Sequence, residues 1–250
     1  MELERIAAGH WRGTEEHQVG GWLLRAAEGF TGRANSALPL GDPGMPLDDA
    51  LAAVTDWYRA RGLPPMIQLP KPRDTEQQGQ NLDHYLNERS WSLRPGPAFV
   101  MTSDLPLPGL RRDDVPSGVE VTAAEEPDDA WAAMYHYRGQ DRLPRIARSV
   151  LTSAQHQSFI SLRKDEELLA IVRLSIANSW AGITAVEVNK AHRRQGLGAA
   201  ITAAACREAK SRGITSVFLQ VESTNAPARA LYEQLGFRYS HEYHYRVAPA

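Results

Sequence analysis

The 250-residue sequence contains a single cysteine, Cys206, so an intrachain disulfide is excluded. Scarce cysteine is typical of proteins in the reducing cytoplasm. The sequence has no uninterrupted apolar run of the roughly 20 residues that a membrane span needs. The charged start, Met1–Arg5, has no apolar core and is unlike a signal peptide. We therefore expect a cytoplasmic protein without a membrane partner.

Charge of one sign is not in large excess. The formal net charge is −2, so no overall basic field attracts nucleic acid. The histidines show no spacing typical of a metal site. His241 and His244, three positions apart on an expected strand, would face opposite sides of it. We expect no nucleic-acid partner and no metal, and any anionic ligand would need a local basic site.

A segment rich in proline and glycine separates two parts of the chain. Residues 105–118 contain three prolines and two glycines, a density that breaks both helix and strand. The sequence therefore predicts a first domain over residues 1–104, a linker over 105–118 and a second domain over 119–250.

The second domain is predicted to have the order β-α-α-β-β-β-α-β-α-β, a mixed α/β fold of the α+β kind. Its expected strands are Val119–Val121, Ser158–Leu162, Leu168–Ala177, Gly182–Val188, Ser216–Val221 and Tyr239–Val247. Its expected helices are Pro127–Tyr137, a short one over residues 146–151, Gly196–Arg212 and Ala226–Leu235.

The first domain contains a weaker version of the same pattern. A helix over Asp48–Arg61 precedes a strand over Pro65–Leu69, and Leu82–Trp91 then parallels Ala230–Phe237. This similarity indicates a duplicated and diverged half. The alternative is that any two helix–glycine–strand units look alike.

The strongest chemical signal lies between an expected strand and an expected helix. The loop over Arg193–Ala199 has the form Arg-x-x-Gly-x-Gly. Glycines allow close approach of a ligand to the backbone, and the helix start offers free N–H groups and partial positive charge. This combination favours a pyrophosphate cradle. A tight turn with surface arginines is the alternative. A Walker phosphate loop is excluded because no Gly-Lys-Ser/Thr follows, and a Rossmann fingerprint fits poorly.

A second segment, Asn225–Phe237, has the form Asn…Ala-Leu-Tyr-x-x-Leu-Gly-Phe. With the loop, in order and spacing, it resembles the two best-known motifs of the Gcn5-related N-acetyltransferase (GNAT) superfamily. One departure is that the family motif has the form Ala-x-x-Leu-Tyr, whereas Ala230 directly precedes Leu231 here, with Ala228 also available. In the first domain, Trp22–Leu40, with its Gly32-Arg33-Ala34-Asn35 segment, resembles actinobacterial tandem GNAT proteins with a degenerate N-terminal half. Some of these have been proposed to act on histone-like proteins.

The resemblance implies acetyl-CoA as cosubstrate and a set of binding residues. The loop amides would hold the pyrophosphate, the preceding strand would pair with the pantetheine arm, and the second motif would lie near the arm and the sulfur. The residues implied are Arg193, Arg194, Gln195, Gly196, Leu197, Gly198 and Ala199 for the pyrophosphate, Val186 and Val188 for the arm, and Asn225 and Tyr232 near the sulfur.

The reaction implied is direct attack of an amine on the thioester. Tyr232 is the candidate general acid, although it could simply pack its helix on the sheet. Deprotonating an alkylammonium at pH 7 costs roughly 4–5 kcal/mol, so a base helps. Some relatives place a glutamate where this sequence has Gln220, which cannot accept a proton. Glu187, Glu222 or a water relay could serve instead, and Glu187 is our candidate.

The corresponding loop of the first domain, Gly41–Pro46, has no arginine. Asp42 would repel phosphate, and its two prolines remove amide donors. We expect this half to have lost the cofactor. The whole is interpreted as an N-acetyltransferase for a small-molecule or protein amine, acting as a monomer or homodimer. A non-catalytic acyl-CoA-binding sensor or scaffold is the alternative.

Overall fold

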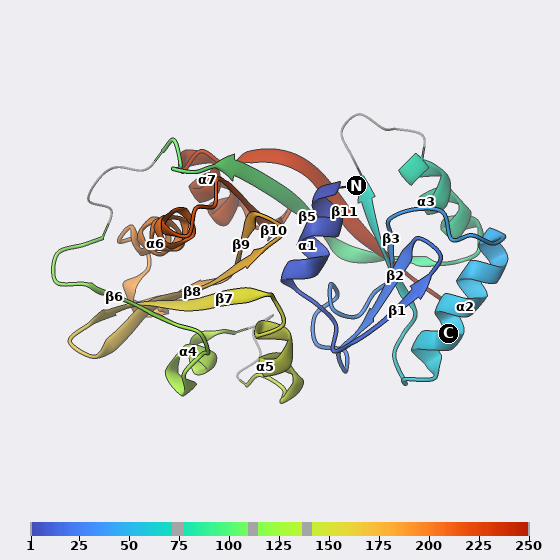
Figure 1. Ribbon diagram of the computed structural model, residues 1–250, viewed down its shortest axis with the longest axis horizontal. Coiled ribbons are helices and arrows are strands. Elements are labelled where there is room, and N and C mark those ends of the chain that lie inside the picture. Colours follow the sequence, from blue (N-terminus) through green and yellow to red (C-terminus); the bar gives the residue numbers. More distant parts are fainter. Residues whose placement is uncertain (1, 72–77, 110–114, 137–141, 250) are drawn as a thin grey trace.

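The computed structural model describes residues 2–71, 78–109, 115–136 and 142–249, and it has a mixed α/β fold (Figure 1). The strands are β1 (Glu15–Val19), β2 (Trp22–Ala26), β3 (Leu38–Pro39), β4 (Met66–Lys71), β5 (Ser92–Asp104), β6 (Glu120–Ala124), β7 (His156–Lys164), β8 (Glu167–Ala177), β9 (Trp180–Val188), β10 (Ser216–Glu222) and β11 (Arg238–Val247). The helices are α1 (Glu2–His10), α2 (Leu47–Arg59), α3 (Gln78–Glu88), α4 (Asp129–Met134), α5 (Ile146–Leu151), α6 (Leu197–Ser211) and α7 (Ala226–Gln234), with a 3₁₀ turn η2 (Lys190–His192).

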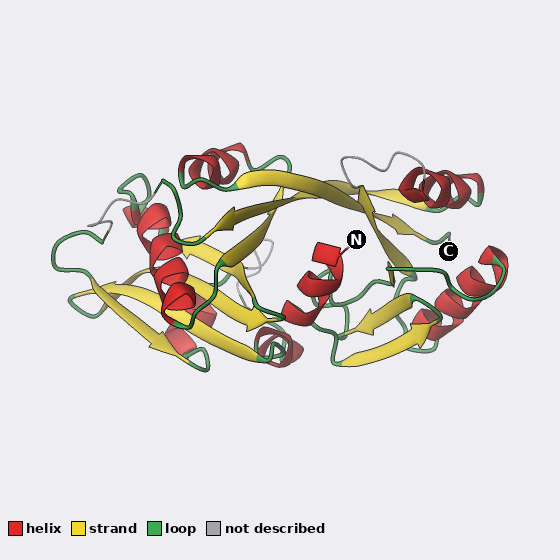
Figure 2. Ribbon diagram, turned by 45° about the horizontal axis from the view of Figure 1, so that its top comes forward, coloured by secondary structure: helices red, strands yellow, loops and turns green. Residues whose placement is uncertain are grey.

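The strands form two sheets. A three-stranded sheet has the order β1-β2-β3, and an eight-stranded sheet has the order β4-β11-β5-β10-β9-β8-β7-β6. Helices α6 and α7 cover one face of the large sheet on the C-terminal side, and α4 and α5 lie on the opposite face (Figures 1 and 2). None of the helices in the described ranges is long and apolar enough to cross a membrane.

The element order predicted for residues 119–250 is confirmed from β6 to β11. The first helix is shorter than Pro127–Tyr137, since α4 begins after Asp128, whose carboxylate caps the N–H of Trp131; Tyr137 lies outside the described residues. Helix α6 is rich in alanine and buries most of its first three turns against the sheet. Cys206 is buried in this interface, and burial raises the pKa of its thiol to about 12.

The two halves exchange their last strands. Strand β5 pairs with β10 as well as with β11, and β11 pairs in turn with β4. Figure 1 shows β5 and β11 running side by side across the molecule, with the C-terminus next to α2. The sheet is therefore continuous through both predicted domains, and the boundaries at 104 and 118 stay a prediction.

Strand β5 is not apparent in the sequence because Pro95-Gly96-Pro97 interrupts it. The register with β11 jumps here: Arg94 opposes Tyr245 and Ala98 opposes Tyr243, so the extra residues form a bulge. Gly96 has a φ of 84°, a conformation that glycine adopts without strain. A bulge allows prolines inside a central strand, because the bulged residues need not donate to the ladder.

The helices of the two halves end in the same way. Helices α2 and α6 are followed by Gly62 and Gly213, with φ of 65° and 79°. Helices α3 and α7 are followed by Ser90 and Gly236, with φ of 61° and 98°. Left-handed residues at helix C-termini are common, but their repetition at both helices of both halves fits a diverged duplication.

The predicted linker is attached to the C-terminal half where it is described. Leu105 and Leu107 are buried in the core that α6 and α7 share with the sheet. The N–H of Leu105 donates to the carbonyl of Thr215, and the N–H of Gly109 to the carbonyl of Leu235. Residues 110–114 lie outside the described part of the chain.

Candidate active site

The central feature of the candidate site is the parting of two parallel strands. Strands β9 and β10 pair from Trp180/Ser216 to Ile183/Leu219 and then separate, although β9 continues to Val188 and β10 to Glu222. Beyond Ile183, the backbone of β9 on the side of β10 therefore makes no ladder hydrogen bonds with that strand. An extended ligand could add to such an edge as a further strand would.

A bulge in β9 accompanies this parting. Ala185 has a φ of 53°, which is unusual for a residue with a Cβ. The register between β8 and β9 shifts between Ile171/Glu187 and Arg173/Thr184, so β9 has one more residue than its partner over this stretch. Bulges re-aim side chains and often lie beside active sites.

The loop before α6 leaves the start of that helix uncapped. Gly196 at the N-cap is left-handed, with a φ of 79°, and no side chain of the described residues caps the first-turn amides. Arg194 is also left-handed, with a φ of 65°. The side chains of Arg193, Arg194 and Gln195 are exposed. Free amides, partial positive helix charge and two arginines thus gather where the sequence predicts a pyrophosphate.

Gly198 has a packing role as well. A Cβ at this position would lie 3.0 Å from Cδ2 of Leu231 on α7 and 4.0 Å from Cγ2 of Val188. The glycine therefore brings the start of α6 close to the second motif segment. The two motifs, separate in the sequence, meet at this point.

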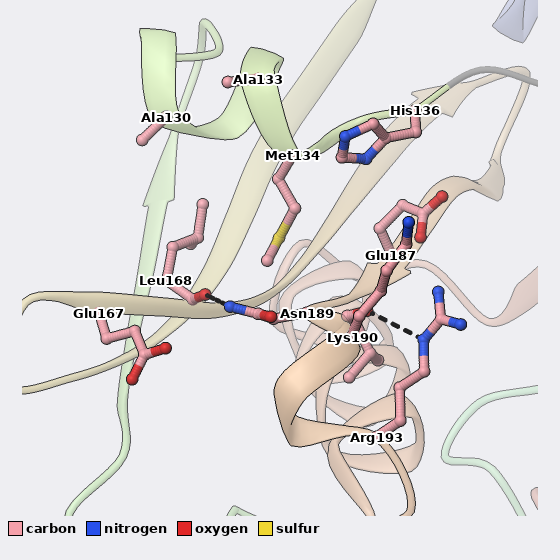
Figure 3. A pocket seen from close by; sticks show the side chains of 11 residues that line it. Ala130, Ala133, Met134, His136, Glu167, Leu168, Glu187, Asn189, Lys190 and Arg193 are labelled. Carbon is pink, nitrogen blue, oxygen red and sulfur yellow. Dashed lines mark hydrogen bonds between the residues drawn. The ribbon is translucent and has the colours of Figure 1, made fainter. Parts of the chain in front are cut away.

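A cavity of about 710 Å³ lies beside the end of β9 (Figure 3). It is lined by Ala130, Ala133 and Met134 of α4, by His136, by Glu167 and Leu168 of β8, and by Glu187, Val188, Asn189, Lys190 and Arg193. In Figure 3 the side chain of Met134 points toward Asn189, whose amide donates to the carbonyl of Leu168, and Arg193 reaches back to the carbonyl of Val188.

The two candidate catalytic side chains lie near each other. Burial raises the pKa of the Glu187 carboxyl, and the nearby charges of Arg193, His136 and Lys190 partly offset this. The hydroxyl of Tyr232 also has a raised pKa, first because of burial and second because of the negative charge of Glu187. Tyr232 is 7% exposed and makes an edge contact with Phe237. A neutral phenol beside a half-buried carboxyl suits a proton donor next to a proton acceptor.

The other predicted residues occupy different places. Val186 and Val188 lie on the part of β9 beyond the ladder, as the pantetheine prediction requires. Asn225 caps α7, where its side-chain oxygen accepts from the N–H of Ala228 at 3.2 Å. Gln220 and Glu222 line a second, smaller cavity on β10, and its lining shares no residue with that of the cavity that Glu187 lines.

Sequence reasoning missed the part that the N-terminal half plays at this site. The loop of residues 27–35 packs against α4 and α5 through a shared core that includes Trp11, Phe30, Trp131 and Ile171. From this loop, the guanidinium of Arg33 donates to the side-chain oxygen of Gln220. No local pattern predicts a contact between residues so far apart, although the Gly32-Arg33-Ala34-Asn35 segment is part of the resemblance to tandem GNAT proteins.

A second arginine, Arg173, is fully buried on β8, and its bonds within the described part of the chain go to neutral oxygens. It donates to the carbonyls of Leu151 and His10, the last residues of α5 and α1, and to the hydroxyl of Thr184. Burial lowers its pKa to about 9. Helix C-termini carry partial negative charge, which explains a buried cation without a carboxylate. Within the described ranges, no group of three or more His, Cys, Asp or Glu side chains could hold a metal ion.

The buried histidines of β11 have structural partners. His241 contacts the carboxylate of Glu4 at 2.7 Å, and His244 contacts that of Asp83 at 2.8 Å. Both contacts join β11 to the N-terminal half, so these histidines stabilise the exchanged strand.

Comparisons with known proteins agree with this architecture. The chain is 26% identical over 98% of its length to an uncharacterized N-acetyltransferase, YobR, of Bacillus subtilis, 97% of which is covered. It is 28% identical over 99% of its length to the probable histone acetyltransferase Rv0428c of Mycobacterium tuberculosis, 73% of which is covered.

Solved structures share the fold. A GCN5-related N-acetyltransferase from Kribbella flavida superposes with a TM-score of 0.69 at 19% identity, over 95% of this chain and 90% of that one. A tandem GNAT protein from the clavulanic acid biosynthesis pathway superposes with a TM-score of 0.65 at 15% identity, over 86% and 76%. The predicted fold class is therefore confirmed.

The family model described as "Probable histone acetyltransferase Rv0428c C-terminal" matches residues 1–246, so it spans both halves and the exchanged strands. The resemblance inferred from the two motifs is confirmed, and the chain belongs to this family of the GNAT N-acetyltransferase superfamily.

Proposed function

We propose that the protein transfers an acetyl group from acetyl-CoA to a primary amine by direct attack of the amine on the thioester. The observation that carries this proposal is the parting of β9 and β10 beside the uncapped start of α6. The parted strands offer an extended backbone edge, and the helix start offers amides for a pyrophosphate. A nucleotide thioester with a long extended arm matches both features.

In this proposal the binding residues are those that the motifs imply. The loop from Arg193 to Ala199 holds the pyrophosphate, and the backbone of Val186 and Val188 pairs with the pantetheine arm. Asn225 uses its oxygen to cap α7 and keeps its amide N–H₂ for the ligand. Acetyl-CoA supplies the activated acetyl group, and the chain's own residues orient it.

The proposed chemistry needs a proton acceptor and a proton donor. An ammonium substrate gives one proton to Glu187, and its nitrogen then forms the N–C bond. As the C–S bond breaks, Tyr232 gives a proton to the leaving sulfur, and the nitrogen loses a second proton that restores Tyr232. A backbone N–H near Val188 steadies the thioester oxygen. Glu187 is favoured over Glu222 as base because burial raises its pKa toward neutrality.

A non-catalytic acyl-CoA-binding sensor or scaffold is the second candidate. It is favoured by Gln220, a neutral side chain at the strand position where some relatives have a glutamate base. The acceptor remains either a small molecule or a protein, and the family description points to protein acceptors among relatives.

Release of free thiol from acetyl-CoA, measured with a mixed panel of amines and Lys-containing peptides, tests the proposal. Turnover with any amine, at a rate above hydrolysis, supports an acetyltransferase. Tight acetyl-CoA binding without turnover supports a sensor. Absence of acetyl-CoA binding contradicts both candidates.

A further inference from the structure

We propose that the acceptor amine carries a carboxylate close to its nitrogen, and that Arg33 of the N-terminal half binds this carboxylate. The inference rests on the proposed function and names the substrate class of the same site. A free amino acid or a close analogue has this chemistry, whereas an internal lysine of a protein or a protein N-terminus does not.

The proposed binding place is a cavity of about 150 Å³ at the junction of the two halves. It lies between the loop that carries Arg33 and the strands β5, β10 and β11, and its polar lining includes Gln220, Glu222, Tyr243 and Tyr245. Its volume is that of about five water molecules, at ~30 Å³ each. Such a cavity fits the head group of a small molecule better than a folded surface.

The position of this cavity links it to the proposed chemistry. Gln220 directly follows Leu219, the last residue of β10 that pairs with β9. The cavity therefore borders β10 at the position where its pairing with β9 ends, and we infer that the thioester end of the pantetheine arm lies close to this position. An amine held beside Gln220 would be close to the acetyl group.

Arg33 brings a positive charge that the protein does not neutralise. Among the residues that the structure describes, one of its five N–H donors bonds to a protein acceptor, the neutral oxygen of Gln220. Its guanidinium also lies over the ring of Trp11, 4.7 Å from the ring centre. Across the part of the chain that the structure describes, Arg33 forms no ion pair with a carboxylate, whereas Arg12, Arg61, Arg89, Arg148, Arg163, Arg212 and Arg246 do.

A second guanidinium lies nearby, although the C-termini of α1 and α5 offset part of its charge. Burial, and after it the charge of Arg33, lowers the pKa of Arg173, whose guanidinium lies 5.2 Å from the ring centre of the same Trp11. Two guanidinium groups beside one indole, neither paired with a carboxylate among the described residues, favour an anionic ligand.

The residue at position 220 supports this interpretation. A glutamate here, as in some relatives, would form an ion pair with Arg33 and cancel its charge. The amide of Gln220 holds the guanidinium in place by a hydrogen bond but leaves its charge available. The absence of a glutamate base, difficult to explain for catalysis alone, thus has a binding explanation.

The loop that carries Arg33 is held firmly. The side-chain oxygen of Asn35 accepts from the amides of Ala27 and Gly29 at 2.8 and 2.9 Å, and its amide donates to the carbonyls of Phe30 and Thr31 at 2.7 and 2.9 Å. Such a staple fixes the loop before a ligand arrives, which lowers the entropy cost of binding.

Close packing of the loop on β11 also depends on a glycine. A Cβ at Gly32 would lie 3.0 Å from Nη1 of Arg94 and from Cζ of Tyr245. A side chain here would require Arg94 or Tyr245 to shift, so the glycine allows the loop to pack closely on these residues, with Arg33 at the cavity wall.

Glu222 completes the recognition. Its exposed side chain lines the same cavity, so the site offers one positive and one negative group. An amine with a neighbouring carboxylate complements both: Arg33 binds its carboxylate, and Glu222 attracts its ammonium before Glu187 accepts the proton. A purely cationic acceptor would meet the unpaired charge of Arg33 and be disfavoured.

The test compares free L-amino acids with their amides as acceptors, in thiol-release assays with acetyl-CoA. We expect kcat/KM to be at least tenfold higher for an acid than for its amide. In Arg33→Gln, kcat/KM for the acid should fall about tenfold to a hundredfold, because a charge-assisted bond is lost, while that for the amide should change little. Arg61→Gln is the matched control: Arg61 also stacks on a tryptophan, Trp57, but lies at the surface of the N-terminal half.

A second variant keeps Arg33 but places a carboxylate beside it, so that an ion pair offsets its charge. Gln220→Glu should remove the preference for the acid, with acetyl-CoA affinity unchanged in a direct binding titration. Equal losses for acid and amide in Arg33→Gln, a preference for the amide, or no turnover of any carboxylate-bearing amine by a protein that binds acetyl-CoA would each overturn this inference. Failure to bind acetyl-CoA would instead overturn the proposed function.

Discussion

The starts of helices α6 and α2 occupy equivalent places in the two halves and differ in every chemical respect. Helix α6 follows Gly196 and two exposed arginines, with no side chain on its first amides. Helix α2 has Pro46 at its N-cap and two aspartates in its first turn. Before it, the carboxylate of Asp42 accepts from the N–H of Gly44. One helix start can attract a phosphate and the other repels it. A fold element can thus be kept while its ligand chemistry is lost.

Helices α7 and α3, the second pair of equivalent helices, also keep their backbone structure but differ in their chemistry. The N–H of Phe237 donates to the carbonyl of Tyr232 at 2.9 Å, and the N–H of Trp91 donates to that of Leu86 at 3.0 Å. The two helix ends share a backbone motif, so Leu86 stands where the second half has Tyr232. The N-terminal half keeps the packing and has no hydroxyl to donate a proton.

The comparison of the two helix starts is tested most directly by placing a negative charge near each of them, at the start of α6 and in the loop before α2. Gly198→Asp should weaken acetyl-CoA binding by more than a hundredfold, since it places a negative charge in the first turn of α6, where the pyrophosphate is predicted to bind. Gly41→Asp, in the loop of the N-terminal half, should leave affinity unchanged, because its Cβ meets only an ordinary contact at 3.6 Å. Isothermal titration measures both.

Gly198→Ala is the control for packing, because its Cβ also approaches Leu231 but carries no charge. If Gly198→Ala loses as much affinity as Gly198→Asp, the effect is steric. If Gly198→Asp binds normally, the pyrophosphate does not lie on this loop.

Removing the hydroxyl that distinguishes the second helix pair should slow the reaction. We expect Tyr232→Phe to lower kcat by roughly a hundredfold, the lower range for general acid catalysis, and to spare acetyl-CoA affinity. Steady-state kinetics and a binding titration separate the two quantities. An unchanged kcat would leave Tyr232 with a packing role only, equivalent to that of Leu86.

One contact between the two halves, made by His10, should make the stability of the protein depend on pH. His10 at the end of α1 contacts Ser175 and the carbonyl of Ala177 on β8, and burial lowers its pKa to about 4. The folded protein favours the neutral imidazole. The contribution of His10 to the free energy of unfolding is therefore complete above the unfolded pKa of about 6.5 and is lost as the pH falls toward 4. Between pH 7 and pH 5 it should reduce the free energy of unfolding by about 2 kcal/mol.

Urea unfolding at several pH values measures this loss. In His10→Gln this fall in the free energy of unfolding between pH 7 and pH 5 should be absent. His84→Gln is the surface control: the His84 side chain is 73% exposed, and the variant should lose stability as the wild type does. The same slope in His10→Gln and in the wild type would assign the pH dependence to other groups.

The smallest expected effect concerns the base. Glu187→Gln should lower kcat/KM about tenfold near neutral pH, since a water relay can partly replace it. Because burial raises the pKa of Glu187, the acid limb of the wild-type pH profile should lie above the ordinary carboxylate value of about 4.3 and should disappear in the variant. An unchanged profile would favour Glu222 or water, and Glu222→Gln would then be the next variant.

The sequence predicted the C-terminal half because its signals are local. The periodicity of α6, the glycines at helix ends and the loop before Leu197 all act within a few residues, and the structure has the elements where these signals predicted them. The two motifs also meet in space, through Gly198 and Leu231.

The missed features depend on contacts that are distant in the sequence. Pro95 and Pro97 hid β5, because only pairing with β11 reveals that they lie in a bulge. The bond from Arg33 to Gln220 spans 187 positions and has no local signature. A single sequence shows which residues can bind or react, but not which of them the exchanged strands bring together.

The exchange of β5 and β11 has a consequence for how the protein is made. Strand β4 emerges early during synthesis, yet its partner β11 emerges only after β5 to β10. Until then one edge of β4 is open, and neither half can complete its own sheet before the other is present. Expressing the halves as separate polypeptides would therefore leave each with an unmatched strand edge, prone to pairing with other chains.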